Sequence, residues 1–386
     1  MNCRHCGAAL QLSFLDLGSA PPSNAYLTQS TLRQPELWFP LRLLVCEACW
    51  LVQTEDHAGR EALFTDDYAY FSSFSSSWLR HAHDYVQAMS SRFMLGPASR
   101  VAEVAANDGY LLQYVRQAGI PCYGVEPTAS TAAAARAKGI DIVEKFFGTA
   151  LAAELVAQGR QVDLVAANNV LAHVPDINDF VAGFALLLKS QGVATFEFPH
   201  LMCMVQQNQF DTAYHEHYSY LSLGAVQRVF AQRKDAGRHL PTAAVAQLLQ
   251  REHDAGMTRS ELYRGFQARA DKVKDDFLAF LLQAKREGKT VAAYGAAAKG
   301  NTLLNYAGVR PDLLSFVVDA NPAKQGKWMP GSRIPIEAES RLKEVRPDFI
   351  VLLPWNLLTE LMQHLHYARE WGAQFVTAVP ELRCTQ

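Results

Sequence analysis

Arg100-Val-Ala-Glu-Val-Ala-Ala-Asn-Asp-Gly109 joins a short β-favouring run to a polar turn that ends in glycine. This pattern is typical of a buried strand that leads through a tight turn into a helix, where backbone N–H groups and the glycine let a ligand approach the main chain. Further along, Glu126 follows a second β-rich run, residues 122–125. An acidic residue in that position commonly binds the hydroxyls of a ribose. The segment therefore predicts a nucleoside site at the start of a doubly wound α/β unit.

The charge of this turn separates two classes of nucleoside cofactor. Dinucleotide-binding folds ordinarily have three glycines in the first turn, whereas this turn has one. Its acidic side chains would repel a pyrophosphate but suit a sulfonium and an amino group, which favours S-adenosylmethionine (SAM) over NAD. A turn that binds no ligand is the structural alternative. The expected cofactor-binding residues are Glu103, Asn107, Asp108, Gly109 and Glu126.

Short β-rich runs alternate with amphipathic helical runs around this turn, as in a parallel sheet covered on both faces. The strands expected in the first unit are residues 100–104, 122–125, 140–143, 162–166 and 193–198. A helical segment of mixed charge, about residues 258–287, leads to a second alternation. Its strands are expected at residues 290–295, 315–319, 349–353 and 374–378, with helices after Gly300 and over residues 357–371. The chain thus contains two doubly wound units.

Two Cys-x-x-Cys pairs, Cys3-Arg-His-Cys6 and Cys46-Glu-Ala-Cys49, precede these units. Each pair points two sulfurs at one place, and two pairs supply the four thiolates of a tetrahedral structural zinc. A disulfide would need an oxidising compartment, and a redox-active pair usually opens a helix behind a strand. We therefore expect zinc at Cys3, Cys6, Cys46 and Cys49, with no open coordination position and no part in the chemistry.

Composition limits the remaining function classes. The 386 residues, 49% hydrophobic and 19% charged, suffice for two or three domains. A formal charge of −2 without a Lys/Arg cluster argues against nucleic acid as a partner. No apolar run approaches the ~20 residues that span a bilayer, and no secretory leader is recognisable. The three remaining cysteines are scattered, so a cytoplasmic protein is expected, with a monomer as the simplest state.

Several motifs together resemble the three-domain sugar C-methyltransferases, over nearly the whole chain. Besides the cysteine pairs and the Glu-x-x-x-Asn-Asp-Gly turn, they are Asn168-Asn-Val-Leu-Ala-His173, Asp211-Thr-Ala-Tyr-His-Glu-His-Tyr-Ser-Tyr220 and Tyr294-Gly-Ala-Ala-Ala-Lys-Gly-Asn301. That family uses SAM to methylate C-3 of nucleotide-activated 4-keto deoxyhexoses in bacterial antibiotic and polysaccharide pathways. The resemblance implies a zinc-binding module at 1–65, a class I methyltransferase domain at 66–235, a helical linker at 236–288 and a Rossmann-like nucleotide domain at 289–386, with the active site between the two large domains.

The implied reaction requires a base, because the methyl group of a sulfonium is already electrophilic and the carbon beside the ketone must lose a proton. By resemblance His217 is that base, and an imidazole with an ordinary pKa near ~6.5 suits the task. Tyr214 and Glu216 belong to the same motif and would orient His217 or hydrogen-bond the enolate oxygen. His215 is expected to be structural.

The resemblance adds further residues to the site. It places His173 and Tyr68 in the catalytic set and Asn168 with the cofactor. In the second unit, a glycine turn opens a helix whose first N–H groups, with Lys299 beside them, would hold a nucleotide diphosphate. The expected substrate-binding residues are Tyr294, Lys299 and Asn301.

Two departures from the family pattern keep other functions open. About twenty residues that complete the family's methyltransferase sheet are absent after Phe230, so that sheet is expected to have an open edge or to be completed by another segment. Ala105 also replaces a glycine in the cofactor turn, where it would crowd the cofactor. A catalytically impaired sugar-nucleotide or SAM-binding protein and a nicotinamide-dependent sugar oxidoreductase are the alternatives to a SAM-dependent methyltransferase.

Overall fold

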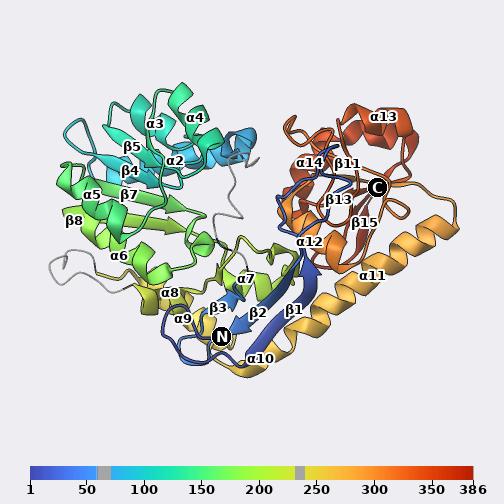
Figure 1. The fold of residues 1–386 in the computed structure, drawn as a ribbon, viewed down its shortest axis with the longest axis horizontal. Helices are drawn as coiled ribbons and strands as arrows, with labels where there is room; N and C mark the ends of the chain where they lie inside the picture. Colours follow the sequence, from blue (N-terminus) through green and yellow to red (C-terminus); the bar gives the residue numbers. More distant parts are fainter. Residues whose placement is uncertain (58, 60–70, 231–239, 386) are drawn as a thin grey trace.

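The computed structural model describes residues 1–57, 59, 71–230 and 240–385. Figure 1 shows two α/β lobes joined by an N-terminal sheet and by the long helix α11 (Phe266–Arg286). Each lobe contains a mainly or wholly parallel sheet, so the predicted α/β class with two doubly wound units is confirmed. Within the described residues, no helix combines the length and the apolar character that a bilayer crossing requires.

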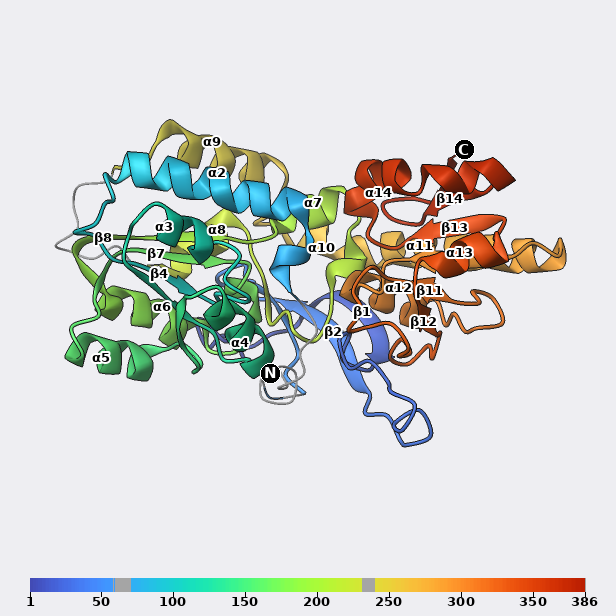
Figure 2. The ribbon, with the colours of Figure 1, turned by 90° about the horizontal axis from the view of Figure 1, so that it is seen from above.

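The first lobe is a five-stranded parallel sheet in the order β6-β5-β4-β7-β8. Its strands are β4 (Val101–Val104), β5 (Cys122–Val125), β6 (Asp141–Val143), β7 (Val162–Asn168) and β8 (Leu188–Glu197). One face packs against α2 (Ser76–Arg92), α3 (Leu112–Gln117) and α4 (Ala129–Ala137), and the other against α5 (Thr149–Ala157), α6 (Ile177–Leu187) and α8 (Leu223–Val229). Figure 2 shows α2 and α5 on opposite sides of this sheet.

The edge strand β8 pairs with β7 and with no antiparallel strand among the described residues. The first lobe is therefore wholly parallel where it is described. Tyr85 and His81 of α2 bond to Thr195 and Glu197 of β8, so this helix covers the end of the edge strand.

The second lobe is a six-stranded sheet in the order β12-β11-β10-β13-β14-β15, in which the short last strand is antiparallel. Its strands are β10 (Val291–Tyr294), β11 (Val317–Val318), β12 (Ile336–Glu337), β13 (Phe349–Leu352), β14 (Gln374–Thr377) and β15 (Arg383–Thr385). Helices α11 and α12 (Ala298–Tyr306) cover one face; α13 (Ser340–Val345), α14 (Leu358–His364) and the 3-10 helix His366–Trp371 cover the other. The linker before α11 contains α9 (Ala243–Asp254) and α10 (Ser260–Arg264).

The N-terminal sheet is antiparallel and contains a strand from far along the chain. Its order is β1-β2-β3-β9, formed by β1 (Leu12–Ala20), β2 (Phe39–Val45), β3 (Val52–Thr54) and β9 (Ser219–Tyr220). The last strand belongs to the Asp211–Tyr220 motif, which the sequence did not connect with the zinc module. A core shared with α11, in which Phe14 stacks on Phe266 at 4.6 Å, fixes this sheet against the second lobe.

Candidate functional site

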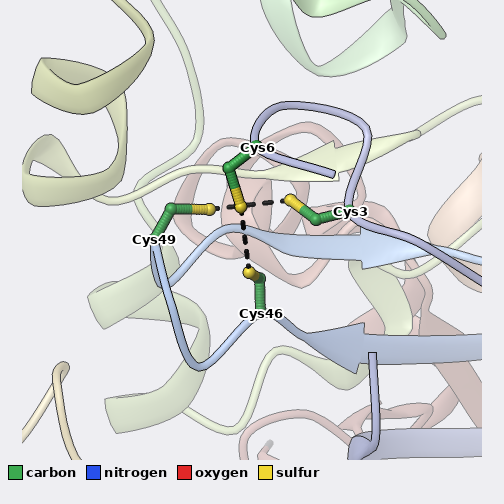
Figure 3. A group of neighbouring side chains, drawn as sticks. All are labelled: Cys3, Cys6, Cys46 and Cys49. Carbon is green, nitrogen blue, oxygen red and sulfur yellow. Dashed lines mark hydrogen bonds between the residues drawn. The ribbon is translucent and has the colours of Figure 1, made fainter. Parts of the chain in front are cut away.

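The four predicted zinc ligands converge on one point (Figure 3). Their sulfurs all lie within 4.8 Å of one another, with 3.6 Å between Cys3 and Cys49 and 3.5 Å between Cys6 and Cys46. Zinc–sulfur bonds of ~2.3 Å in a tetrahedron place sulfurs roughly 3.8 Å apart, so the cluster fits the metal. All four positions are protein thiolates. A zinc ion here would have no open position and would stabilise the module.

The cofactor turn has the backbone conformation that a glycine-rich turn would adopt. Ala105, Asn107 and Gly109 all have positive φ, at 60°, 49° and 75°. The positive φ of Gly109 favours glycine, and a Cβ there would lie 2.3 Å from Cδ1 of Ile140, whose side chain would have to move. Ala105 occupies a left-handed conformation that an L-residue adopts at a cost. The replacement of the family glycine by Ala105 therefore introduces backbone strain into this turn.

Glu126 and the turn are connected directly. The Glu126 carboxylate, at the carboxyl end of β5, accepts backbone hydrogen bonds from Asn107 at 2.9 Å and from Thr128 at 3.0 Å. Burial raises the pKa of Glu126, and these backbone donors oppose the shift. The hydroxyls of Thr128 and Thr131 also donate to this carboxylate, so a ribose hydroxyl would compete with them for its oxygens. Asp108 is held by Lys138 at 3.2 Å.

Buried polar atoms without partners surround the ends of β4 and β7. Both oxygens of Glu103, Oδ1 of Asp108 and Nδ2 of Asn168 have no hydrogen-bond partner among the described residues. Burial raises the pKa of Glu103 well above its ordinary value; the neighbouring Tyr110 hydroxyl opposes the shift, although it lies outside normal hydrogen-bond geometry. Such groups are costly unless a ligand satisfies them. The carboxylates suit a cationic amino acid and the amide suits a carboxylate, so the donor set fits the methionine part of SAM.

Two histidines from different elements meet beyond these strand ends. His173 lies in the 3-10 helix Leu171–His173 after β7, and its ring centroid is 4.6 Å from that of His217. His217 Nδ1 is 3.1 Å from the Thr212 carbonyl, which can only accept, so Nδ1 carries the proton and Nε2 the lone pair. Burial is the main reason that the pKa of His217 lies well below its ordinary value, and electrostatic repulsion from His173 lowers it further. Burial lowers the pKa of His173 to about 4.

The other members of the motif have different environments. The ring of Tyr214 lies over His217 with 4.0 Å between centroids. Glu216 is buried and accepts from the Asn24 amide at 3.1 Å, while its second oxygen has no hydrogen-bond partner within the described part of the chain. The carbonyl of Thr212, rather than Glu216, therefore orients the His217 ring. His215, which was expected to be structural, bonds to the Phe39 carbonyl at 3.2 Å.

Lys299 lies beside the histidine motif rather than on an isolated turn. Its ammonium donates to Asn356 at 2.8 Å and lies over the Trp355 ring, 4.4 Å from the centroid. Burial lowers the pKa of Lys299, and Asp211 opposes the shift. Asp211 is fully buried and accepts from Trp355 Nε1 at 2.7 Å; burial raises its pKa to about 6. Asp211 stands in the motif quoted above, but its residue type alone gave it no role.

The remaining predicted residues are distributed as follows. Tyr294, at the end of β10, donates to Glu339 at 3.3 Å and lies in a hydrogen-bonded group with Tyr367. Asn301 is buried in α12, where its Oδ1 accepts from Asn305 at 3.1 Å; its Nδ2 bonds to none of the residues that the structure describes. Tyr68 lies outside the described residues.

A small open pocket lies at His217, and one of its lining residues, His200, was not indicated by the sequence. Thr212 and Tyr220 also line it. His200 Nε2 is 2.6 Å from Glu252 of α9, and this carboxylate also accepts the Gly224 N–H at 2.8 Å. The two side chains are 52 positions apart, so neither periodicity nor a motif could have paired them.

Comparisons with known proteins agree with this architecture. Family models match a putative zinc binding domain at residues 3–64, a methyltransferase domain at 78–234 and a C-methyltransferase C-terminal domain at 223–380. The C-methyltransferase NovU of Streptomyces niveus is 31% identical over 403 residues, covering 99% of this chain and 96% of that protein. The aligned length exceeds the 386 residues of this chain, so the relative carries residues that this chain lacks.

Solved structures overlap less. A SAM-dependent methyltransferase from Clostridium acetobutylicum is 13% identical, with 34% of this chain and 54% of that chain covered and a TM-score of 0.28. The plantazolicin methyltransferase BpumL is 9% identical, with 48% and 80% covered and a TM-score of 0.34. The full-length similarity to NovU and the three consecutive family matches decide the assignment. The chain belongs to the SAM-dependent C-methyltransferases that carry an N-terminal zinc-binding domain.

Proposed function

We propose that the protein transfers a methyl group from SAM to C-3 of a nucleotide-linked 4-keto deoxysugar through an enolate generated by His217. The observation that carries the proposal is the neutral His217 imidazole, with Nδ1–H fixed on Thr212 and Nε2 able to accept a proton, in a pocket lined by polar and apolar groups. The choice of a nucleotide ketosugar rests on the motif resemblance. When bound, SAM supplies an electrophilic methyl group.

The arrangement of this chain's residues supports the steps around that methyl group. Glu103, Asn168 and Glu126 would hold the cofactor at the carboxyl ends of β4, β7 and β5, the edge at which doubly wound sheets bind ligands. His217 would remove the C-3 proton through Nε2. Proton transfer to a positioned base contributes about 10²–10⁴-fold in rate.

Positive charge near the base would stabilise the enolate. Lys299 is close enough to Asp211 and to His217 to shift the pKa of both groups. Its ammonium on the Trp355 face would stabilise the diphosphate of the substrate or the developing enolate oxygen, since each is an anion. Tyr214, whose ring is tilted over that of His217, would hydrogen-bond the sugar beside the reacting carbon.

Mass spectrometry of the purified protein with SAM carrying a labelled methyl group and a panel of nucleotide 4-ketosugars tests this function. We expect one labelled methyl group on the sugar, at the carbon next to the ketone. NovU has residues that this chain lacks. Their absence is the specific reason to test the alternative of a binding protein that transfers no methyl group. Tight binding of SAM and of a nucleotide sugar without methyl transfer to any sugar of the panel would favour that alternative.

A further inference from the structure

Arg4, between the two cysteines of the first zinc knuckle, reaches out of the zinc module. Its buried guanidinium donates at 2.9 Å to the carbonyl of Thr54 on β3 and at 2.9 Å to the carbonyl of Pro175, two residues after His173. It also pairs with Asp56 at 3.0 Å and lies over the Tyr218 ring, 5.3 Å from its centroid. One knuckle side chain thus contacts the segments that carry both site histidines.

The strand β3 connects the same knuckle to the backbone of His217. Gln53 is fully buried, accepts the Arg4 backbone N–H at 2.9 Å and donates to Cys3 Sγ at 3.3 Å. Next to it, the Thr54 hydroxyl donates to the His217 carbonyl at 2.5 Å. The Thr54 N–H donates to the Tyr218 carbonyl at 3.2 Å, which continues the pairing of β3 with β9.

His5, the second residue between Cys3 and Cys6, connects the first zinc knuckle to the first lobe. His5 Nδ1 is 2.8 Å from Asn178 Oδ1, and the Asn178 amide donates to the His5 carbonyl at 2.8 Å. Asn178 lies in the first turn of α6, five residues after His173. In addition, the Tyr218 N–H donates to the Ala172 carbonyl at 2.7 Å, so the two histidine segments are also bonded to each other.

We propose that Arg4 and Thr54 are positioning residues for His217, and that the first zinc knuckle sets the geometry of the base as well as stabilising its own module. This inference rests on the proposed role of His217. Zinc would fix Cys3 and Cys6, and the Cys3–Gln53 and Arg4–Thr54 contacts would transmit that rigidity to the His217 main chain. A displacement of ~1 Å at a reacting group can cost about 10²-fold in rate, so such a support matters for catalysis.

The test compares Thr54→Val, which keeps the shape and β-branching but removes the hydroxyl, with Thr54→Ser, which keeps the hydroxyl. Arg4→Gln removes the guanidinium. Arg42→Gln is the matched control, because Arg42 pairs with Glu55 in the same module but is half-exposed and bonds to neither histidine segment. We expect Thr54→Val and Arg4→Gln to lower kcat about 10-fold or more, with KM, SAM affinity and one zinc per chain unchanged, and Thr54→Ser to restore the rate.

A second readout needs no substrate. The ring signals of His217 in a histidine-labelled protein, identified by their loss in His217→Asn, should shift in Thr54→Val and Arg4→Gln and remain in place in Arg42→Gln. Unmoved signals together with a parental kcat in Thr54→Val and Arg4→Gln would overturn the inference while leaving the methyltransferase reaction intact. Shifted signals in a protein that methylates no ketosugar would support the positioning role and reject the proposed function instead.

Discussion

The imidazole rings of His173 and His217 meet edge to face, with their planes at 67°. They come from different places: one follows β7 of the methyltransferase sheet, and the other precedes β9 of the N-terminal sheet. Two protonated rings at this distance would repel each other, and burial already lowers both pKa values. The pair is therefore neutral at neutral pH, and it can accept one proton far more easily than two.

The first prediction concerns proton removal, which precedes methyl transfer. With substrate and S-adenosylhomocysteine in heavy water, the parent enzyme should exchange deuterium into C-3. His217→Asn should lose both this exchange and methylation by about 10²–10⁴-fold, because it removes the general base. Nuclear magnetic resonance of the recovered sugar and labelled-methyl assays measure the two losses, and calorimetry should find both ligands still bound. A His217→Asn protein with near-parental methylation would transfer the role to His173 or Tyr214.

The second prediction is the position of the acid limb in the pH profile. Because the pKa of His217 is lowered from its ordinary ~6.5, the ring stays neutral as pH falls through that value. The rate of C-3 exchange should therefore remain near its plateau at pH 6.5 and decline only at lower pH. Asp211, with a pKa near 6, titrates in the same region, so the profile is to be compared with that of Asp211→Asn. An acid limb at or above 6.5 in both proteins would contradict the neutral, buried state of His217.

The third prediction concerns the ribose contact. Glu126→Ala should weaken SAM binding by about 1.5–3 kcal/mol, the range for hydrogen bonds to a charged group. Part of this loss would come from the turn, because Glu126 also holds the Asn107 N–H. Glu144→Ala is the control, since that carboxylate follows the next strand but is exposed and pairs with Arg136. Isothermal titration calorimetry measures the affinity of the parent and of Glu126→Ala for SAM, and of the parent for NAD. Unchanged SAM affinity in Glu126→Ala, or tighter binding of NAD than of SAM by the parent, would contradict the assignment of Glu126 to the SAM site.

Most strands were predictable because apolar β-rich runs of four or more residues between helical segments have few alternatives in an α/β fold. The four strands of the N-terminal sheet (β1, β2, β3 and β9) were not predicted, and neither were β12 and β15. In β9 and β12, two residues carry no periodicity, and their pairing depends on distant neighbours. The expected strand at residues 315–319 shortens to Val317–Val318 for the same reason: its pairing with β10 spans two residues.

The site, like the fold, has some features that the sequence predicts and others that it does not. The zinc ligands follow from a local spacing that the metal itself dictates. The contacts of Arg4 with Pro175 and of Thr54 with His217 join residues more than 160 positions apart, and the residue types occur everywhere on protein surfaces. Only the packing of the N-terminal sheet between the lobes brings them to the histidines, and no pattern in the sequence encodes that packing.

The fourth prediction uses the strained turn. Ala105 has φ of 60°, a conformation that costs an L-residue about 1–2 kcal/mol. Ala105→Gly relieves that cost but adds disorder to the unfolded chain, so the free energy of unfolding should change by less than about 1 kcal/mol. Removal of the Cβ should nevertheless tighten SAM binding. Arg346→Gly, at an exposed position with φ of 52°, shows the effect of the same relief far from the cofactor. Weaker SAM binding by Ala105→Gly would refute crowding at this position.

The fifth prediction separates two roles of Lys299. Lys299→Met should weaken binding of a nucleoside diphosphate by about 1.5–3 kcal/mol if the ammonium holds the phosphate, because a charge-assisted contact is lost. SAM affinity should be unchanged, since Lys299 belongs to the second lobe. Lys289→Met is the control: Lys289 precedes the opposite end of β10 and pairs with Asp348 at the surface.

Calorimetry with the nucleoside diphosphate and a kinetic assay with the ketosugar must be read together. A loss of affinity in Lys299→Met places the phosphate at the start of α12. Parental affinity with a kcat reduced about 10-fold or more would instead place the developing enolate oxygen near this ammonium, since a contact made only in the transition state changes kcat alone. In either case the pKa of Asp211 should rise further, because Lys299 is the charge that opposes its shift. Parental affinity and parental kcat together would exclude both roles.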